Sequence, residues 1–409
     1  MTKAAVEASS SPNTTNLMSG PPPFGPDRLV TTENWQLAPA NRWGFQHARE
    51  LVPSARIKRG SGSLWVLPRN ERDVRDVIFE VDGVRSTVGQ LLDATQTDGF
   101  LVLHRGSVAA EHYFNAMEPD TPHVLMSVSK SITAAVCGCL VGRGLLDVDV
   151  LITEFVPELK GTSLSGATAR HLLDMRAGIR FDENYDNVHA DVRVYEQIYL
   201  WRPRTDPDLP TDVTDYFATL RADGEHGGPF RYNSILTDVL AWVLERATGT
   251  RFHELVAREL WSAMGAEFDA EVTLDACGNA MADGGISTTL RDLGRFGLQY
   301  LPDPASGRPQ VIPESWVADT IRGAVDGPRA FGVEPGFPSG SHYRSCWWIR
   351  NSDEPYLHGS GIYGQNVFVH APTETVVAKL SSWPTPLDRR ALEATATAVV
   401  AIGTFLEQR

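Results

Sequence analysis

The sequence predicts an α+β protein, in which both ends of the chain build one antiparallel sheet and a helical domain is inserted between them. Residues 98–114 form two strand-like runs around Arg105-Gly106, which is a hairpin signal. Residues 127 to about 280 are mostly helix and loop. Aromatic and β-branched runs typical of strands return after residue 342. A cleft is therefore expected where the two domains meet, because ligand sites favour such boundaries.

Helices are predicted where apolar residues recur at helical spacing and a turn residue follows. Residues 127–144 show this pattern and end in Gly142 and Gly144, and residues 234–248 show it again before Gly249. Further helices are predicted over residues 168–175, 288–300, 313–322 and 388–409, and further strands over residues 342–350, 364–371 and 375–381.

The domain organisation follows from these elements. We expect a mobile tail over residues 1–33, a sheet domain formed by residues 34–126 and 286–409, and an all-helical insertion over residues 127–285. The active site is expected in the cleft between the two domains.

The composition narrows the function classes. The 409 residues carry a formal net charge of −14, with 42% hydrophobic and 22% charged residues, as in ordinary globular proteins. This charge disfavours nucleic acids and anionic membranes as partners, and no apolar run is long enough for a membrane helix. The first 25 residues lack the apolar core of a secretory signal, and four cysteines are too few for a disulfide scaffold, so we expect a cytoplasmic protein.

Several catalytic signatures are absent from the sequence. It contains no G-x-S-x-G elbow, no H-E-x-x-H motif, no P-loop and no G-x-G-x-x-G motif, and no acidic, histidine or cysteine run has metal-ligand spacing. The sequence therefore offers no recognisable metal-binding motif.

One motif does carry chemistry, the S-x-x-K sequence from Ser127 to Lys130 at the start of the 127–144 helix. Residues three apart on a helix are neighbours, so Lys130 can reach the Ser127 hydroxyl and accept its proton. A lysine is a poor base at neutral pH, so we expect burial or a second cation to depress its pKa. The free amides at a helix N-terminus would also favour an oxyanion near Ser127. A capping serine beside a surface lysine is the alternative, but the small-residue apolar helix that follows disfavours a solvated surface.

Two later features extend this candidate site. Tyr232 precedes the 234–248 helix, from which its phenol can relay a proton to a leaving group. Residues 358–366 are glycine-rich and lead into a strand, so their backbone can approach a ligand closely and offer an amide to an oxyanion. Read alone, Tyr232 is better explained as a packing residue and the glycines as a loop without a role.

Together the three features resemble the serine β-lactamase and penicillin-binding protein superfamily, in its class C and esterase-like branch. Within it, the chain is similar to the 6-aminohexanoate-dimer hydrolases, from about residue 34 to the C-terminus. Residues 171–179 and 284–293 look like the helix-and-turn after the nucleophile helix and the return to the sheet domain. The segments that carry the closer resemblance are Asn41–Phe45, Leu51–Ala55, Leu125–Lys130, Thr237–Trp242 and Lys379–Pro384.

The resemblance implies a serine β-lactamase/transpeptidase-like fold without metal or cofactor, and it leaves a homodimer open. It implies that Ser127 is the nucleophile, Lys130 its base and Tyr232 the proton relay, with an oxyanion hole formed by the amides of Ser127 and Ile362. The positions that it implies for substrate contacts are Tyr185, Glu196, Trp201, Ser234, Asp283 and Tyr363. Of these, Glu196 and Asp283 would favour a substrate with an ammonium end.

The chain also departs from the family pattern. In the antibiotic-acting members a late strand carries a Lys-Thr-Gly motif. The corresponding glycine-rich segment of this chain, residues 358–366, has no lysine, which disfavours β-lactam hydrolysis. The usual Tyr-x-Asn motif becomes Tyr232-Asn233-Ser234, so Ser234 is expected to hydrogen-bond near Lys130.

Three functions are compatible with these residues. The leading one is a serine hydrolase that cleaves small linear amides or esters through a Ser127 acyl-enzyme. An acyltransferase, in which an amine acceptor replaces water, uses the same residues. A binding module without activity is disfavoured, because Ser127, Lys130 and Tyr232 are all present.

Overall fold

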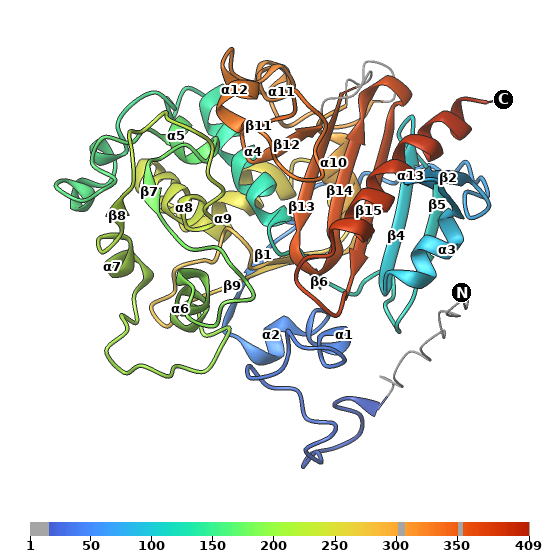
Figure 1. The fold of residues 1–409 in the computed structure, drawn as a ribbon, viewed down its shortest axis with the longest axis horizontal. Coiled ribbons are helices and arrows are strands. Elements are labelled where there is room, and N and C mark those ends of the chain that lie inside the picture. Colours follow the sequence, from blue (N-terminus) through green and yellow to red (C-terminus); the bar gives the residue numbers. More distant parts are fainter. Residues whose placement is uncertain (1–15, 302–306, 351–354, 409) are drawn as a thin grey trace, which may run out of the picture.

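The computed structural model describes residues 16–301, 307–350 and 355–408, and it confirms the predicted α+β class. Its largest element is an antiparallel sheet of seven strands in the order β11-β12-β13-β14-β15-β4-β5 (Figure 1). Strands from the two ends of the chain meet where β15 pairs with β4. The strand bounds are β4 Thr97–His104, β5 Ser107–Tyr113, β11 His342–Arg344, β12 Trp347–Arg350, β13 Tyr356–Gly361, β14 Gln365–His370 and β15 Thr375–Ser381.

Two tight turns shape this sheet. Arg105 and Gly106, with φ of 49° and 75°, join β4 to β5 as the predicted hairpin. The prediction of one strand over residues 342–350 is wrong. Ser345 and Cys346 have φ of 49° and 59°, so the chain reverses there and β11 pairs antiparallel with β12.

Helices cover both faces of the seven-stranded sheet. Alternate residues of β4 enter different cores: Phe100 and Val102 face α13 (Arg389–Glu407), whereas Leu101 and Leu103 face α10 (Leu290–Leu298). Burial on both faces explains why β4 reads as a continuous apolar run rather than an alternating one.

A second sheet, of four strands, leads directly into the candidate nucleophile. It has the order β1-β9-β10-β6, and the pairing of β6 with β10 fixes the chain just before α4 (Val128–Gly142). The bounds of its strands are β1 Ser54–Ile57, β9 Ala270–Thr273, β10 Ile286–Thr288 and β6 His123–Val124.

The interval 127–285 is mostly helical, but it is not all-helical as predicted. It contains β9 of the second sheet and a two-stranded antiparallel sheet of β7 (Ile179–Arg180) with β8 (Arg221–Ala222). Its α-helices after α4 are α5 Ala169–Leu173, α6 Asp191–Ile198, α7 Val213–Phe217, α8 Ile235–Thr248 and α9 Phe252–Val256. The remaining elements of the chain are α1 Asn41–Gly44, α2 Ala48–Leu51, β2 Ile78–Val81, β3 Val84–Thr87, α3 Val88–Ala94, α11 Glu314–Arg322 and α12 Gly327–Phe331.

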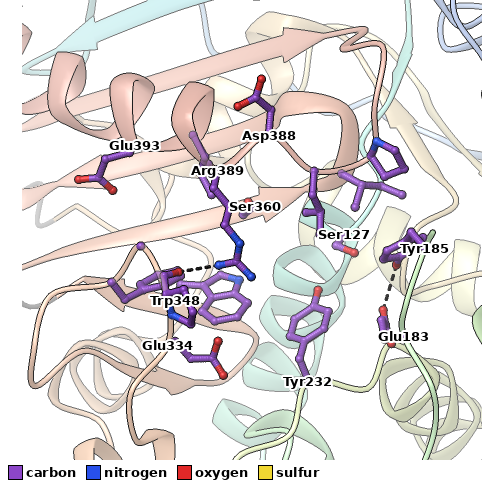
Figure 2. Close-up of a pocket in the computed structure, with 18 of the residues that line it drawn as sticks. Ser127, Glu183, Tyr185, Tyr232, Glu334, Trp348, Ser360, Asp388, Arg389 and Glu393 are labelled. Atoms are coloured by element: carbon purple, nitrogen blue, oxygen red, sulfur yellow. Dashed lines mark hydrogen bonds between the residues drawn. The ribbon is translucent and has the colours of Figure 1, made fainter. Parts of the chain in front are cut away.

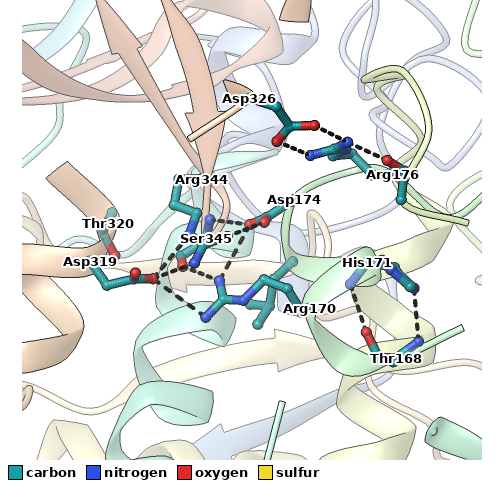
Figure 3. A network of polar contacts seen from close by, with 12 residues as sticks. Thr168, Arg170, His171, Asp174, Arg176, Asp319, Thr320, Asp326, Arg344 and Ser345 are labelled. Carbon is teal, nitrogen blue, oxygen red and sulfur yellow. Dashed lines mark hydrogen bonds and ion pairs between the residues drawn. The ribbon is translucent and has the colours of Figure 1, made fainter. Parts of the chain in front are cut away.

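A polar network joins the helical region to the sheet domain (Figure 3). Asp174, which caps α5, accepts hydrogen bonds from Arg344 at 2.6 Å and from the Ser345 amide at 3.0 Å. Asp319 of α11 also pairs with Arg344, at 2.7 Å, and with Arg170 of α5, at 3.5 Å. These contacts hold the β11–β12 turn against the end of α5.

Part of the predicted N-terminal tail, residues 1–15, lies outside the described residues. Most of residues 16–33 are exposed, whereas Val30 is buried and Leu17 and Met18 pack against the hydrophobic core. Among the described residues, no helix combines the length and apolar character needed to cross a bilayer.

Candidate active site

The site begins with a sharp turn from β6 into α4. Met126 is buried at φ 48°, a left-handed conformation that a non-glycine residue adopts at a cost of about 1–3 kcal/mol. The turn leaves the half-buried Ser127 immediately before the first residue of α4. The surrounding sheet and helix therefore hold the chain in a strained path at the candidate nucleophile.

Lys130 reaches back to Ser127 one helical turn later. Its Nζ donates to the Ser127 Oγ at 2.8 Å and to the Asp283 carbonyl at 2.9 Å, and it lies 3.5 Å from the Asp283 Oδ2. The side chain is only 1% exposed, so these contacts are shielded from water. The predicted Ser127–Lys130 contact is thus present in the structure.

Tyr232, three residues before α8, is the third member of the group with Ser127 and Lys130. Its ring centroid lies 5.3 Å from the Lys130 Nζ, and its hydroxyl interacts with both Ser127 and Lys130. The Trp348 ring of β12 stacks with the Tyr232 ring, with centroids 5.3 Å apart. Burial raises the pKa of Tyr232 above its usual value, although the Lys130 ammonium partly opposes this effect.

The charge of Lys130 differs from the prediction of a depressed pKa. Burial by itself lowers the pKa of Lys130, but the phenolate form of Tyr232 and the carboxylates of Asp283 and Glu183 outweigh it and raise the pKa above its usual value. The resting lysine is therefore an ammonium group that donates to Ser127.

A second buried acid lies behind this ammonium. Asp238 of α8 accepts from the amides of Ala282 and Asp283 at 2.6 and 3.0 Å and from the Tyr195 hydroxyl at 2.5 Å. Burial, together with the neighbouring Asp283 charge, raises the pKa of Asp238 well above its usual value. Asp238 therefore fixes the backbone at Asp283, whose carbonyl in turn holds Lys130.

The end of β13 approaches the start of α4 through Gly361. A Cβ atom at this position would lie 2.6 Å from the Leu125 carbonyl and 3.0 Å from the Ser127 amide nitrogen, so only glycine fits without a shift. Ile362 follows and lines the same cavity as Ser127. The two amides implied for the oxyanion hole therefore come from segments in direct contact.

The cavity above Ser127 has an empty volume of about 1150 Å³, part of which is open to solvent (Figure 2). Its walls are mainly apolar and aromatic. Four of its charged residues lie on α13, at its start or on the 334–337 segment, and the fifth, Glu183, lies beside Tyr185. The lining residues are Ser127, Glu183, Tyr185, Tyr232, Glu334, Pro335, Gly336, Phe337, Trp348, Ser360, Gly361, Ile362, Trp383, Pro386, Leu387, Asp388, Arg389, Leu392 and Glu393.

Of the six residues expected to contact substrate, only Tyr185 lines this cavity. Ser234 does not bond to Lys130; its hydroxyl and its amide both donate to Glu183, the amide at 2.8 Å. Glu196 is buried between Arg193 and Arg202, at 2.8 and 2.5 Å, so its charge is already neutralised.

The other three expected residues lie behind the cavity wall. The Trp201 indole donates to Thr273 at 3.0 Å, and Asp283 contacts Lys130. Tyr363 is buried, with its amide bonded to the Pro386 carbonyl at 2.8 Å. The expectation that Glu196 and Asp283 face an ammonium end of the substrate is therefore not supported by their positions.

Sequence reasoning missed all five charged residues that line the cavity, which are Glu183, Glu334, Asp388, Arg389 and Glu393. Glu183 accepts from the Tyr185 hydroxyl at 3.0 Å, and burial raises its pKa while Lys130 lowers it. Its position two residues before Tyr185 was the one available signal, because alternate residues of an extended segment share a face. The described residues hold no cluster of three metal-ligating side chains.

Comparison with known proteins agrees with this geometry. The Beta-lactamase family model matches residues 84–402. A 6-aminohexanoate-dimer hydrolase of Paenarthrobacter ureafaciens is 37% identical over 360 residues, which cover 87% of this chain and 89% of the relative. A solved Bacillus anthracis structure, described as a candidate 6-aminohexanoate-dimer hydrolase, is 26% identical with a TM-score of 0.84, covering 93% of this chain and 97% of its own.

A more distant structure shares the fold. EstCE1, described as a hydrolase with promiscuous acyltransferase activity, is 17% identical with a TM-score of 0.58, covering 77% of this chain and 96% of its own. The family match, the close relative and the serine site lead to one conclusion: the chain belongs to the beta-lactamase family and is a serine hydrolase of that fold.

Proposed function

We propose that this serine hydrolase cleaves small linear amides or esters through an acyl-enzyme on Ser127. The observation that carries the proposal is the 2.8 Å contact between the Lys130 Nζ and the Ser127 Oγ, at the base of an apolar cavity. The relative named for 6-aminohexanoate-dimer hydrolysis supports a linear amide as the substrate class.

In this mechanism Lys130 and Tyr232 act as one coupled proton carrier. When the pair holds one proton fewer than at rest, it accepts the Ser127 hydroxyl proton while the Oγ attacks the substrate carbonyl carbon. The amides of Ser127 and Ile362 donate to the resulting oxyanion. The tetrahedral intermediate then collapses as the carbonyl–nitrogen or carbonyl–oxygen bond breaks, and Tyr232 gives its proton to the leaving group.

Deacylation runs through the same groups in reverse. Water attacks the ester on Ser127 and transfers a proton to the Lys130–Tyr232 pair, and the Ser127 Oγ leaves and recovers a proton from the pair. An amine that replaces water at this step would give an amide, which is the acyltransferase alternative.

The raised pKa values of Lys130 and Tyr232 make the productive state of the pair a minor one at neutral pH. Below the apparent pKa of the pair, its population rises about tenfold per pH unit. The rate of acylation is therefore expected to increase with pH.

The proposal is tested with a p-nitrophenyl ester, a linear 6-aminohexanoate dimer and a chromogenic cephalosporin, each assayed with and without an added amine. We expect turnover of the ester and the dimer, little cephalosporin turnover, and a covalent acyl adduct by mass spectrometry that is absent in Ser127→Ala. Ser360→Ala removes another hydroxyl of the same cavity and should retain the adduct.

Two results would change this proposal. If the wild-type enzyme and Ser127→Ala are equally inactive on the ester and the dimer and neither forms an adduct, the proposed function is wrong. If amide product exceeds acid product when the amine is present, acyl transfer is the main reaction.

A further inference from the structure

The charged residues at the cavity mouth are unevenly partnered. Among the carboxylates, Glu393 pairs with Arg350 at 2.8 Å, and Asp388 accepts the Ala391 amide at 2.9 Å as the cap of α13. Glu334 lies on the segment opposite α13 and forms no ion pair with a described residue. The mouth is therefore acidic overall.

Arg389 is the one cationic residue among the described residues that line the cavity. Its Nη1 donates to the Pro335 carbonyl at 2.8 Å, and it forms no ion pair with a described carboxylate. Figure 2 shows the side chain reaching from the start of α13 toward Trp348, on the side of Ser127 opposite Tyr185 and Glu183. One N–H group of the guanidinium is thus hydrogen-bonded, and the other N–H groups are available to a ligand.

The surroundings of Arg389 suit a carboxylate ligand. A guanidinium group presents paired N–H donors that match the two oxygens of a carboxylate. Arg389 itself is exposed at the cavity mouth, but the neighbouring wall is apolar, since Phe337, Trp348, Ile362 and Leu392 line it, and such a wall strengthens an ion pair formed against it. The contact with Pro335 also holds the guanidinium over the cavity before a ligand arrives.

We propose that Arg389 binds the carboxylate end of the substrate, separated from the scissile carbonyl by an apolar spacer, and so selects for acyl compounds with an anionic end. The selection rests on the proposed function of the Ser127 site. It also accounts for the acidic surroundings: without Arg389, the carboxylates Glu334 and Asp388, which form no ion pair with a described residue, repel an anion. Loss of Arg389 should therefore remove the preference for an acid and shift it toward neutral substrates.

The test uses two matched pairs of substrates. In one pair the carboxylate lies on the acyl side of the scissile bond, and in the other it lies on the leaving-group side. One pair is the mono-p-nitrophenyl ester of adipic acid and its terminal amide, and the other is the linear 6-aminohexanoate dimer and its C-terminal amide. In at least one pair, we expect Arg389→Ala to lower kcat/KM for the acid by about 10- to 100-fold, with little change for the amide. Arg389→Lys should restore part of the preference.

Arg390→Ala is the matched control, because Arg390 is exposed, lies next in sequence and does not line the cavity. It should leave the acid-to-amide ratio as in the wild type. If Arg389→Ala lowers acid and amide equally, displacement of the Pro335 segment explains the loss and the proposal is wrong. It is also wrong if the wild type shows no preference for the acid in either pair.

Binding separates this inference from the proposed function. Calorimetry on Ser127→Ala, which cannot turn over, should show tighter binding of the acid than of the amide, and Arg389→Ala in the same background should remove the difference. Equal binding of the two would overturn the role of Arg389 even if the wild type forms the acyl adduct. If no adduct forms but the binding difference is present, the proposed reaction fails and Arg389 still stands as the carboxylate site.

Discussion

An alanine at position 361 would place a methyl group between the end of β13 and the turn that carries Ser127. Its Cβ would lie 2.6 Å from the Leu125 carbonyl, which is 0.8 Å short of the 3.4 Å where ordinary contacts begin, and 3.0 Å from the Ser127 amide nitrogen. Both neighbours are backbone atoms, so no side chain can rotate away. Gly361 is also paired with Gln365, so the strain must move the segment that continues into Ile362.

The size of the effect follows from this displacement. A shift of slightly under 1 Å separates the Ile362 amide from the position that an oxyanion needs, and misplacements of this order cost about 100-fold in rate. Removing one oxyanion donor costs about 10²–10³-fold in kcat. We therefore expect Gly361→Ala to lower kcat by about 100-fold, with a loss of stability of about 1–3 kcal/mol from overpacking.

The assay is steady-state hydrolysis of a p-nitrophenyl ester, with thermal unfolding followed in parallel. Gly359→Ala is the matched control, because its Cβ would meet the Val367 and Ser131 side chains at 2.8 and 3.2 Å rather than the backbone at Ser127. It should reduce stability with much less effect on kcat. A folded Gly361→Ala enzyme with kcat within a few-fold of the wild type would refute the oxyanion role of the Ile362 amide.

Three further predictions follow from the charge environment. Asp283→Asn removes a carboxylate 3.5 Å from the Lys130 Nζ, so the rising limb of the pH–rate profile should move about 1–3 units toward lower pH; an unmoved limb in a folded variant would contradict the charge assignment. Burial lowers the pKa of Lys379 to about 7, so between pH 7 and 10 the unfolded chain binds a proton that the folded chain does not, and stability rises with pH across this window by up to about 5 kcal/mol. Lys379→Met should flatten that rise in Tm, whereas unchanged pH dependence would place the effect elsewhere. Asp174→Asn weakens the network with Arg344 and should lower the free energy of unfolding by about 1.5–3 kcal/mol, measured as reduced Tm; an unchanged Tm would show that Asp319 alone suffices.

Local sequence was sufficient for much of the framework. The i, i+3 spacing predicted the contact between Ser127 and Lys130, and the structure shows it at 2.8 Å. The Arg105-Gly106 turn and the helix closed by Gly249 follow from backbone preferences within a few residues. These predictions succeed because the physical cause lies inside the segment itself.

The Ser345-Cys346 reversal shows where local sequence misleads. Residues 342–350 have strand composition throughout, and neither turn residue is one that favours positive φ. The reversal is held by contacts from elsewhere in the chain, since the Ser345 and Cys346 amides bond to Asp174 and to the Leu173 carbonyl, at 3.0 and 2.9 Å. A helix end more than 170 residues away therefore decides the break in this strand.

The sequence by itself determined the α+β class and the presence of a serine, a lysine and a tyrosine in a usable order, because spacing and periodicity are local properties. Tertiary structure alone decided that Lys130 rests as an ammonium, that Glu196 is neutralised by its arginine partners, and that Arg389 reaches the cavity. The physical reason is that charge state and access depend on groups brought together from distant parts of the chain: the carbonyl that holds the Lys130 Nζ lies 153 residues further along.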